Sequence, residues 1–183
     1  MRPPDPKKRE RILTSAIKLF VEKGYREATA IDIAKPAKLG ASHIYTYFKD
    51  KDDLLVQAIL HMKEEHTALS TELAKKSVGL DDEHFFEQFY EVQATIYHRV
   101  RFIIQCMLTP ELFYLFESVD FDYSAVFIPY LKDWPEELAK HTARALGSIS
   151  VSYFLLGDID NAKAASLNIF RNAKASMKKE ILQ

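Results

Sequence analysis

Residues 29–54 read TAIDIAKPAKLGASHIYTYFKDKDDL, and this stretch predicts short helices joined by tight turns. Thr29 and Asp32 stand three positions apart, as in a capping box, so a helix is expected to begin directly after Thr29. A second helix is expected after the break at Lys-Leu-Gly, where Ile44 and Phe48 lie four positions apart on one side. The spacing therefore predicts a helix-turn-helix whose exposed second helix fits the DNA major groove, which is about 12 Å wide.

The residues of this stretch divide into an apolar set and a small or polar set, as a groove-binding helix requires. The apolar set is expected to face the core of the head: Ile33, Ala34, Ala37, Leu39, Ile44 and Phe48. The other set is expected to face outward: Ala41, Ser42, His43, Thr46 and Tyr47. Outward donors and acceptors can bond base edges and phosphates, so this face is the candidate DNA-binding surface.

Two residues depart from a regular helix-turn-helix. Pro36 falls inside the first helix of the pair, where a proline removes a hydrogen bond and typically costs about 3 kcal/mol. Lys38 occupies the turn, where left-handed backbone is strained for any residue with a side chain. We therefore expect the first helix to be short or kinked, or the head to sit at an unusual angle.

The rest of the chain also follows a helical period. Apolar residues recur at helical spacing before Gly24, which predicts a helix there. Asp50 and Asp53 can cap a long fourth helix. Pro135 suits the first turn of another long helix that ends near Gly157. Further helices are expected over residues 82–107, from Pro110, over 123–133 and over 161–180. Because glycine and proline number only 5 and 7 in 183 residues, we expect an all-α fold of about nine helices.

The net charge of -1 hides an asymmetry between the head and the rest of the chain. Residues 1–51 hold twelve basic and six acidic residues, a net charge of +6, which leaves -7 for the remainder. A basic head on an acidic body indicates a polyanionic partner at one end, although a solvated helix face is an equally good interpretation of the charge alone.

An enzyme, a metalloprotein or a membrane protein is disfavoured by the sequence. HExxH, CxxC, GxSxG and glycine-rich phosphate loops are all absent. Cys106, the single cysteine, lies in an apolar run and is expected to be a buried hydrophobe. His61, Glu65 and His66 form a weak alternative as a metal site. We expect no catalytic residue, cofactor, metal or membrane partner, and a cytoplasmic location.

The head resembles the DNA-binding domain of the TetR (tetracycline repressor) family. The resemblance rests on the core I-Y-x-Y-F-x-x-K, which runs from Ile44 to Lys51, and on the spacing from Gly24-Tyr25 and Thr29. It covers about a quarter of the chain; the remainder resembles the family only in the order and length of its helices. It implies a DNA-binding domain over residues 1–50 and a helical ligand-binding and dimerisation domain over residues 51–183.

The resemblance also implies roles for individual residues of the head. Thr29 would cap its helix and touch a phosphate, while Ser42 and His43 would read base edges beside Ala41 and Thr46. Tyr45 and Tyr47 would reach the DNA backbone with their hydroxyls, and Lys51 would bind a phosphate as a point charge. For Tyr45, packing in the core is an alternative of equal weight.

For the body, the resemblance implies a small-molecule site and a homodimer. The aromatic residues of the body could line a pocket for an apolar or aromatic effector, although ordinary core packing is the alternative for each of them. The candidates are Phe89, Gln93, Tyr97, Phe113, Phe127 and Trp134. A stretch of small residues and the last helix are expected to form the dimer interface, unless this surface packs within one chain: Ala145, Ile149, Ser152, Ile169, Phe170, Ala173 and Met177.

The resemblance thus implies a ligand-responsive transcription repressor. As a dimer it would bind a near-palindromic operator of double-stranded DNA, with its heads in major grooves about 34–36 Å apart. An unidentified effector would release the DNA by favouring another spacing of the heads. The alternative is a helical protein-interaction module whose helix-turn-helix has lost DNA binding, which Pro36 and Lys38 keep open.

Overall fold

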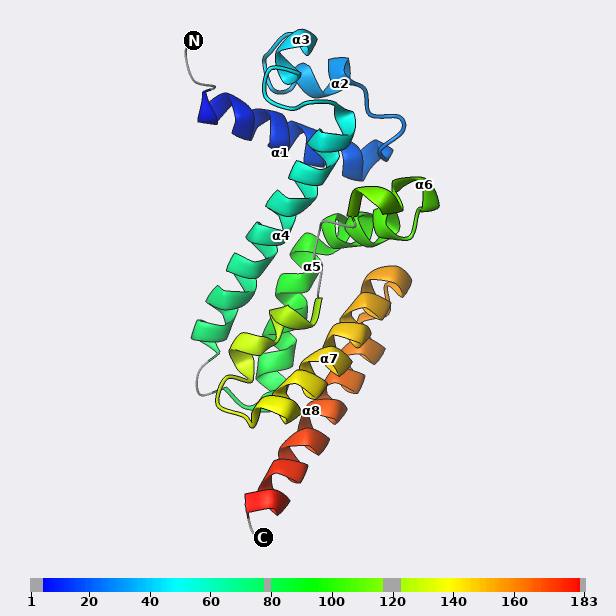
Figure 1. The fold of residues 1–183 in the computed structure, drawn as a ribbon. Helices are drawn as coiled ribbons and strands as arrows, with labels where there is room; N and C mark the ends of the chain where they lie inside the picture. Colours follow the sequence, from blue (N-terminus) through cyan, green and yellow to red (C-terminus); the bar gives the residue numbers. More distant parts are fainter. Residues whose placement is uncertain (1–4, 78–79, 117–122, 182–183) are drawn as a thin grey trace. The chain divides into compact units, whose positions relative to one another are not determined.

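The computed structural model describes residues 5–77, 80–116 and 123–181, and within these ranges all regular secondary structure is helical (Figure 1). The elements are α1 (Pro6–Lys23), α2 (Ala30–Ala34), α3 (Ala41–Ile44), α4 (Lys51–Lys76), α5 (Asp82–Met107), α6 (Pro110–Phe113), η1 (Tyr114–Phe116), η2 (Tyr123–Val126), η3 (Ile128–Tyr130), α7 (Glu136–Leu156) and α8 (Ile159–Ile181), where η marks a 3-10 helix. The all-α class is confirmed. None of the helices in these ranges is long and apolar enough to cross a membrane.

The helix ends follow the local signals of the sequence. The Asp5 carboxylate caps α1 by accepting the Lys7 N–H at 3.0 Å. Helix α7 begins directly after Pro135 and ends at Gly157, whose φ of +76° places it in the left-handed region. Glycine adopts that conformation at no steric cost, which is why it terminates the helix there.

The segment 123–133 differs from the single helix that the sequence predicts. It forms the two 3-10 helices η2 and η3, closed by bonds from Phe127 N–H to the Ser124 carbonyl at 2.9 Å and from Tyr130 N–H to the Phe127 carbonyl at 3.0 Å. Pro129 has no N–H to donate, so an α-helical ladder cannot run through this segment. The described residues therefore hold eight α-helices and three 3-10 helices, against the nine or so helices expected.

The chain forms two compact units, each with its own core. The first unit comprises Met1–Glu64 and His98–Asp120, and the second comprises Glu65–Tyr97 and Phe121–Gln183. Fully buried side chains of the first unit include Ile12, Leu13, Phe20, Ile33, Ile44, Leu54 and Leu55. Those of the second unit include Phe86, Phe89, Tyr90, Phe127 and Phe154. The functional boundary expected after residue 50 stays a prediction.

Candidate nucleic-acid interface

The helix-turn-helix is held on α1 by a buried frame within the first unit. The Ser15 hydroxyl donates to the Ile33 carbonyl at 2.7 Å, which ties α1 to α2. Ile44 and Phe48, the two apolar residues of the α3 segment, are buried, and the Arg9 guanidinium lies 5.4 Å from the centre of the Phe48 ring. The inward-facing residues thus lie where the sequence predicts them, apart from Leu39, which is half-buried.

The turn between α2 and α3 accommodates both unusual residues. Lys38 has φ +55°, as expected for a residue in the position where glycine is preferred. Its N–H donates to the Lys35 carbonyl at 3.1 Å, and the Leu39 N–H donates to the Ala34 carbonyl at 3.0 Å. These two bonds form a Schellman motif, so residues 35–37 complete a last helical turn after α2. Pro36 lies on the exposed side of that turn, and the prediction of a short helix is confirmed.

Helix α3 and the turns directly after it expose the residues that the sequence assigns to DNA. Ser42, His43 and Thr46 are exposed, and Ala41 and Tyr47 are half-buried. Tyr45 is 51% exposed, so the alternative of core packing for this ring is not supported. The α-helix ends at Ile44 rather than at Phe48, because the Thr46 and Tyr47 N–H groups bond three residues back and tighten the last turns.

Two capping boxes fix the starts of α2 and α4, the helices before and after α3 in the chain. The Asp32 N–H donates to the Thr29 hydroxyl oxygen at 3.1 Å, and the Thr29 N–H donates back to the Asp32 carboxylate at 3.4 Å. At the start of α4, the Asp53 N–H donates to Asp50 at 2.8 Å, while the Asp53 carboxylate accepts the Lys49 N–H at 2.8 Å. Both predicted caps are therefore present.

Lys51 is held in place by its own chain. Its ammonium group donates to the Arg26 carbonyl at 3.1 Å and lies 4.4 Å from the centre of the Tyr25 ring. Partial burial lowers the pKa of this ammonium group. Since an ammonium group has three donors and only one is used here, two remain for a phosphate, and the side chain is already ordered.

A polar cluster at the start of α4 was not predicted from the sequence. The Asp52 carboxylate accepts the hydroxyls of Tyr25 and Tyr114, the latter at 2.7 Å. These bonds hold the pKa of Asp52 below its usual range. Close by in sequence, Arg26 pairs with Glu111 at 3.3 Å. The cluster joins the loop after α1, the start of α4 and η1. The two tyrosines lie 27 and 62 positions from Asp52, so local sequence patterns could not reveal it.

Comparison with known proteins identifies the head. Residues 12–58 match the model of the bacterial regulatory proteins of the tetR family. The HTH-type transcriptional regulator HbdR of Aromatoleum sp. (strain CIB) is 47% identical over 55 residues. The head of this chain thus matches the DNA-binding domain of the TetR family. The alignment covers 28% of this chain and 24% of HbdR, so the chain spans about a quarter of the length of that relative.

Solved structures share the fold of nearly the whole chain. A structure from Mesorhizobium loti MAFF303099, assigned to the TetR family, has a TM-score of 0.66 at 18% identity and covers 93% of this chain and 96% of its own. The TetR-family repressor FadR of Thermus thermophilus, solved in complex with lauroyl-CoA, has a TM-score of 0.58 at 18% identity and covers 90% and 92%. At this identity, the likeness is one of fold.

The predicted effector residues of this chain lie in different surroundings. Phe89, Gln93 and Phe127 are fully buried, and the rings of Phe89 and Phe127 pack with their centres 4.8 Å apart. The Gln93 side-chain oxygen lies 3.1 Å from His66 Nε2. Tyr97 and Trp134 are half-buried, and Phe113 is exposed and belongs to the first unit. Their role in binding an effector stays a prediction.

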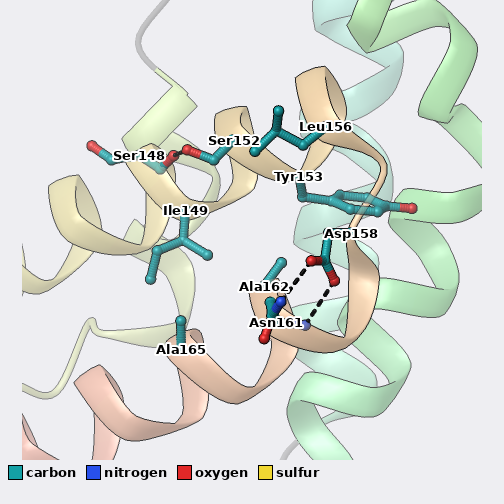
Figure 2. Close-up of a pocket in the computed structure, with 9 residues that line it drawn as sticks. All are labelled: Ser148, Ile149, Ser152, Tyr153, Leu156, Asp158, Asn161, Ala162 and Ala165. Atoms are coloured by element: carbon teal, nitrogen blue, oxygen red, sulfur yellow. Dashed lines mark hydrogen bonds between the residues drawn. The ribbon is translucent and has the colours of Figure 1, made fainter.

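The predicted dimer residues occupy two kinds of position on α7 and α8. Ala145, Ile149 and Ser152 reach the surface of α7, and a groove of about 380 Å³ lies between Ile149, Ser152 and Leu156 on one side and Ala165 on the other. Figure 2 shows Ile149 on α7 pointing toward Ala165 on α8.

On α8, the ring of Phe170 packs within its own chain, 5.5 Å from Phe86 and 5.0 Å from Trp134 between ring centres. For Phe170, this is the alternative that the sequence left open. Ile169, Ala173 and Met177 are half-buried. Their place in a dimer interface stays a prediction.

The cysteine and the histidines considered for an enzyme or metal site are buried or contact other side chains. Burial raises the pKa of the Cys106 thiol to about 12, which disfavours the nucleophilic thiolate. His61 lies 3.4 Å from Glu10, and His66 bonds Gln93. In the part of the chain that the structure describes, no three His, Cys, Asp or Glu residues are grouped as metal ligands.

Proposed function

We propose that this chain is a DNA-binding transcription regulator that acts as a cytoplasmic homodimer on a near-palindromic operator. The observation that carries the proposal is the exposed face of the helix-turn-helix, where Ser42, His43, Tyr45 and Thr46 stand out from a frame that buries Ile44. Side chains that can bond base edges and phosphates are placed together on a rigid support, as direct readout of the major groove requires.

Charge supports the same partner. Residues 1–51 carry a net charge of +6, while the remainder carries -7, so the acidic remainder disfavours DNA and the head attracts it. Lys51 contributes a preordered cation at the start of α4. Contacts of this kind fix the register of the protein on the DNA, and the side chains of α3 supply the sequence preference.

The Schellman turn weakens the alternative of a helical interaction module. That alternative depends on Pro36 and Lys38 disrupting the head, but both are accommodated while Ile33, Ile44 and Phe48 stay buried. The strain at Lys38 is about 1 kcal/mol, far below the stability of a folded domain.

The regulatory part of the proposal is repression relieved by a small apolar or aromatic effector. A ligand that binds the body and favours an unsuitable spacing of the two heads lowers the affinity for DNA by population shift. The aromatic core of the second unit, which includes Phe89 and Phe127, supports an apolar effector.

The test is selection of DNA fragments from the source genome. Purified protein is incubated with the fragments at two salt concentrations, and the retained DNA is sequenced beside that retained by a Tyr47→Ala, Lys51→Ala double variant. We expect the native chain to enrich a near-palindromic site and the variant not to. If nothing is enriched, even after the protein is refolded free of any bound ligand, the DNA-binding proposal fails and the interaction module takes its place.

A further inference from the structure

A second cavity in the second unit has the chemistry of a ligand site. It encloses about 540 Å³, within the usual range for small-molecule sites, between the end of α4, the start of α5, η3 and α8. Its apolar wall consists of the rings of Phe85, Tyr130 and Phe170. The Phe85 ring centre lies 4.5 Å from that of Tyr130 and 6.2 Å from that of Phe170. We call this cavity the Phe170 pocket.

The charged groups that line the Phe170 pocket include more cations than anions. Three lysines from three separate segments line it, namely Lys75, Lys132 and Lys174, against two carboxylates, Asp82 and Asp133. The Lys174 ammonium donates to Asp82 at 2.8 Å, so this pair is neutralised.

The remaining charges of the lining are two ammonium groups and one carboxylate. Glu72, the acid one turn before Lys75 on α4, bonds Lys76 at 2.6 Å. The lining therefore keeps a net positive charge beside an aromatic wall.

We propose that the Phe170 pocket binds a small amphipathic anion, with an aromatic or acyl body against the rings and a carboxylate or sulfonate toward Lys75 and Lys132. An apolar body gains by leaving water for the rings, and the anionic group is attracted by the two ammonium groups. The same lysines would repel an organic cation. Assigning this ligand as the effector rests on the proposed function, whereas its binding does not.

The chain carries its own reporter for this pocket. Trp134 is the single tryptophan, and its ring centre lies 5.0 Å from that of Phe170. A fluorescent ligand in the pocket accepts excitation energy from Trp134, so binding is read as loss of tryptophan emission and gain of ligand emission. The readout requires no DNA, so its failure and that of the DNA-binding proposal are distinguishable.

The experiment compares two probes that share one body. The first, 8-anilinonaphthalene-1-sulfonate, is an anion, and the second, N-phenyl-1-naphthylamine, is the same body without the sulfonate. We expect one molecule of the anion to bind per chain. Its affinity should fall about fivefold in a Lys75→Gln, Lys132→Gln variant, because two exposed charge contacts are lost. The neutral probe should be unaffected by that variant.

Two further variants locate the site. Lys140→Gln is the matched control, because Lys140 lies in the same unit on α7, pairs with Glu136 and Glu137, and does not line the pocket. It should leave both probes unaffected. Thr71→Phe places a ring in the pocket from α4 and should abolish the energy transfer, while an unchanged circular dichroism spectrum and melting temperature confirm folding.

Three results would each overturn the proposal. The first is that neither probe accepts energy from Trp134, which means that the chain has no ligand site there. The second is that the lysine variant lowers the affinity for both probes equally or for neither, which means that the pocket does not prefer anions. The third is that energy transfer persists in the folded Thr71→Phe variant, which means that the probe binds elsewhere.

Discussion

Replacing Lys51 by methionine tests the DNA-binding proposal at a residue whose two roles can be separated. The ammonium group of Lys51 donates to the Arg26 carbonyl and lies over the Tyr25 ring, and we propose that it also contacts a phosphate. Methionine keeps an unbranched apolar stem and loses the charge. The variant therefore removes one interaction within the head and one with DNA.

The expected free energies show that the assay measures the loss of the DNA contact and not unfolding of the head. A cation over a ring at an exposed site contributes about 0.5–1 kcal/mol, too little to unfold a domain of ordinary stability. Each phosphate contact contributes about -0.9 to the slope of log K against log salt, so two copies of Lys51 per dimer contribute about -1.8. Between 50 and 200 mM salt, the ratio of native to variant affinity should therefore shrink about twelvefold.

The assay is fluorescence anisotropy on the selected operator at four or more salt concentrations. Lys18→Met is the matched control, because Lys18 is an exposed lysine of α1 that pairs weakly with Glu22 at 3.9 Å and loses the same charge. We expect the control to keep the native slope. Urea denaturation of all three proteins confirms that the heads are folded under the conditions of the assay.

Two outcomes would refute this reasoning. Equal slopes for the native chain and Lys51→Met mean that Lys51 contacts no phosphate, and its ammonium group then serves only the head. Equal loss of slope in Lys51→Met and Lys18→Met means that the net charge of the head matters and the position of Lys51 does not.

Three further predictions concern stability, measured by urea denaturation. Lys38→Gly should raise the free energy of unfolding by about 1 kcal/mol by relieving the left-handed strain at φ +55°, while Lys38→Ala should not; equal effects contradict this. Gly147→Ala should lower the free energy of unfolding by about 1 kcal/mol. The new Cβ would lie 3.0 Å from the Ser124 backbone, and the overpacking cost of about 2 kcal/mol exceeds the gain in helix propensity of about 1 kcal/mol. A more stable variant would refute the close contact. Burial lowers the pKa of His66 below its ordinary value of 6.5, so stability should fall as the pH drops below about 6.5, where the unfolded chain gains a proton that the buried imidazole does not. His66→Gln should remove part of this dependence, and an unchanged pH profile contradicts it.

The helix ends and the outward face of the head were predictable because they depend on residues close together in sequence. The Thr29–Asp32 capping box, the left-handed turn at Lys38 and the glycine end of α7 are set by hydrogen bonds and backbone angles within a few residues. The period of apolar residues likewise predicted that Ile44 and Phe48 are buried. Each of these signals is local, so one sequence suffices.

The tertiary structure decided which residues meet across long separations. Asp52 accepts hydroxyls from Tyr25 and Tyr114, and Phe170 packs against Phe86 although an apolar face on the last helix suits a partner chain equally well. Helical periodicity identifies an apolar face but not what covers it, because burial in the same chain and burial in a dimer select the same residue types. The sequence alone therefore predicted the head and its outward-facing residues, and only the packing of the body revealed the Phe170 pocket.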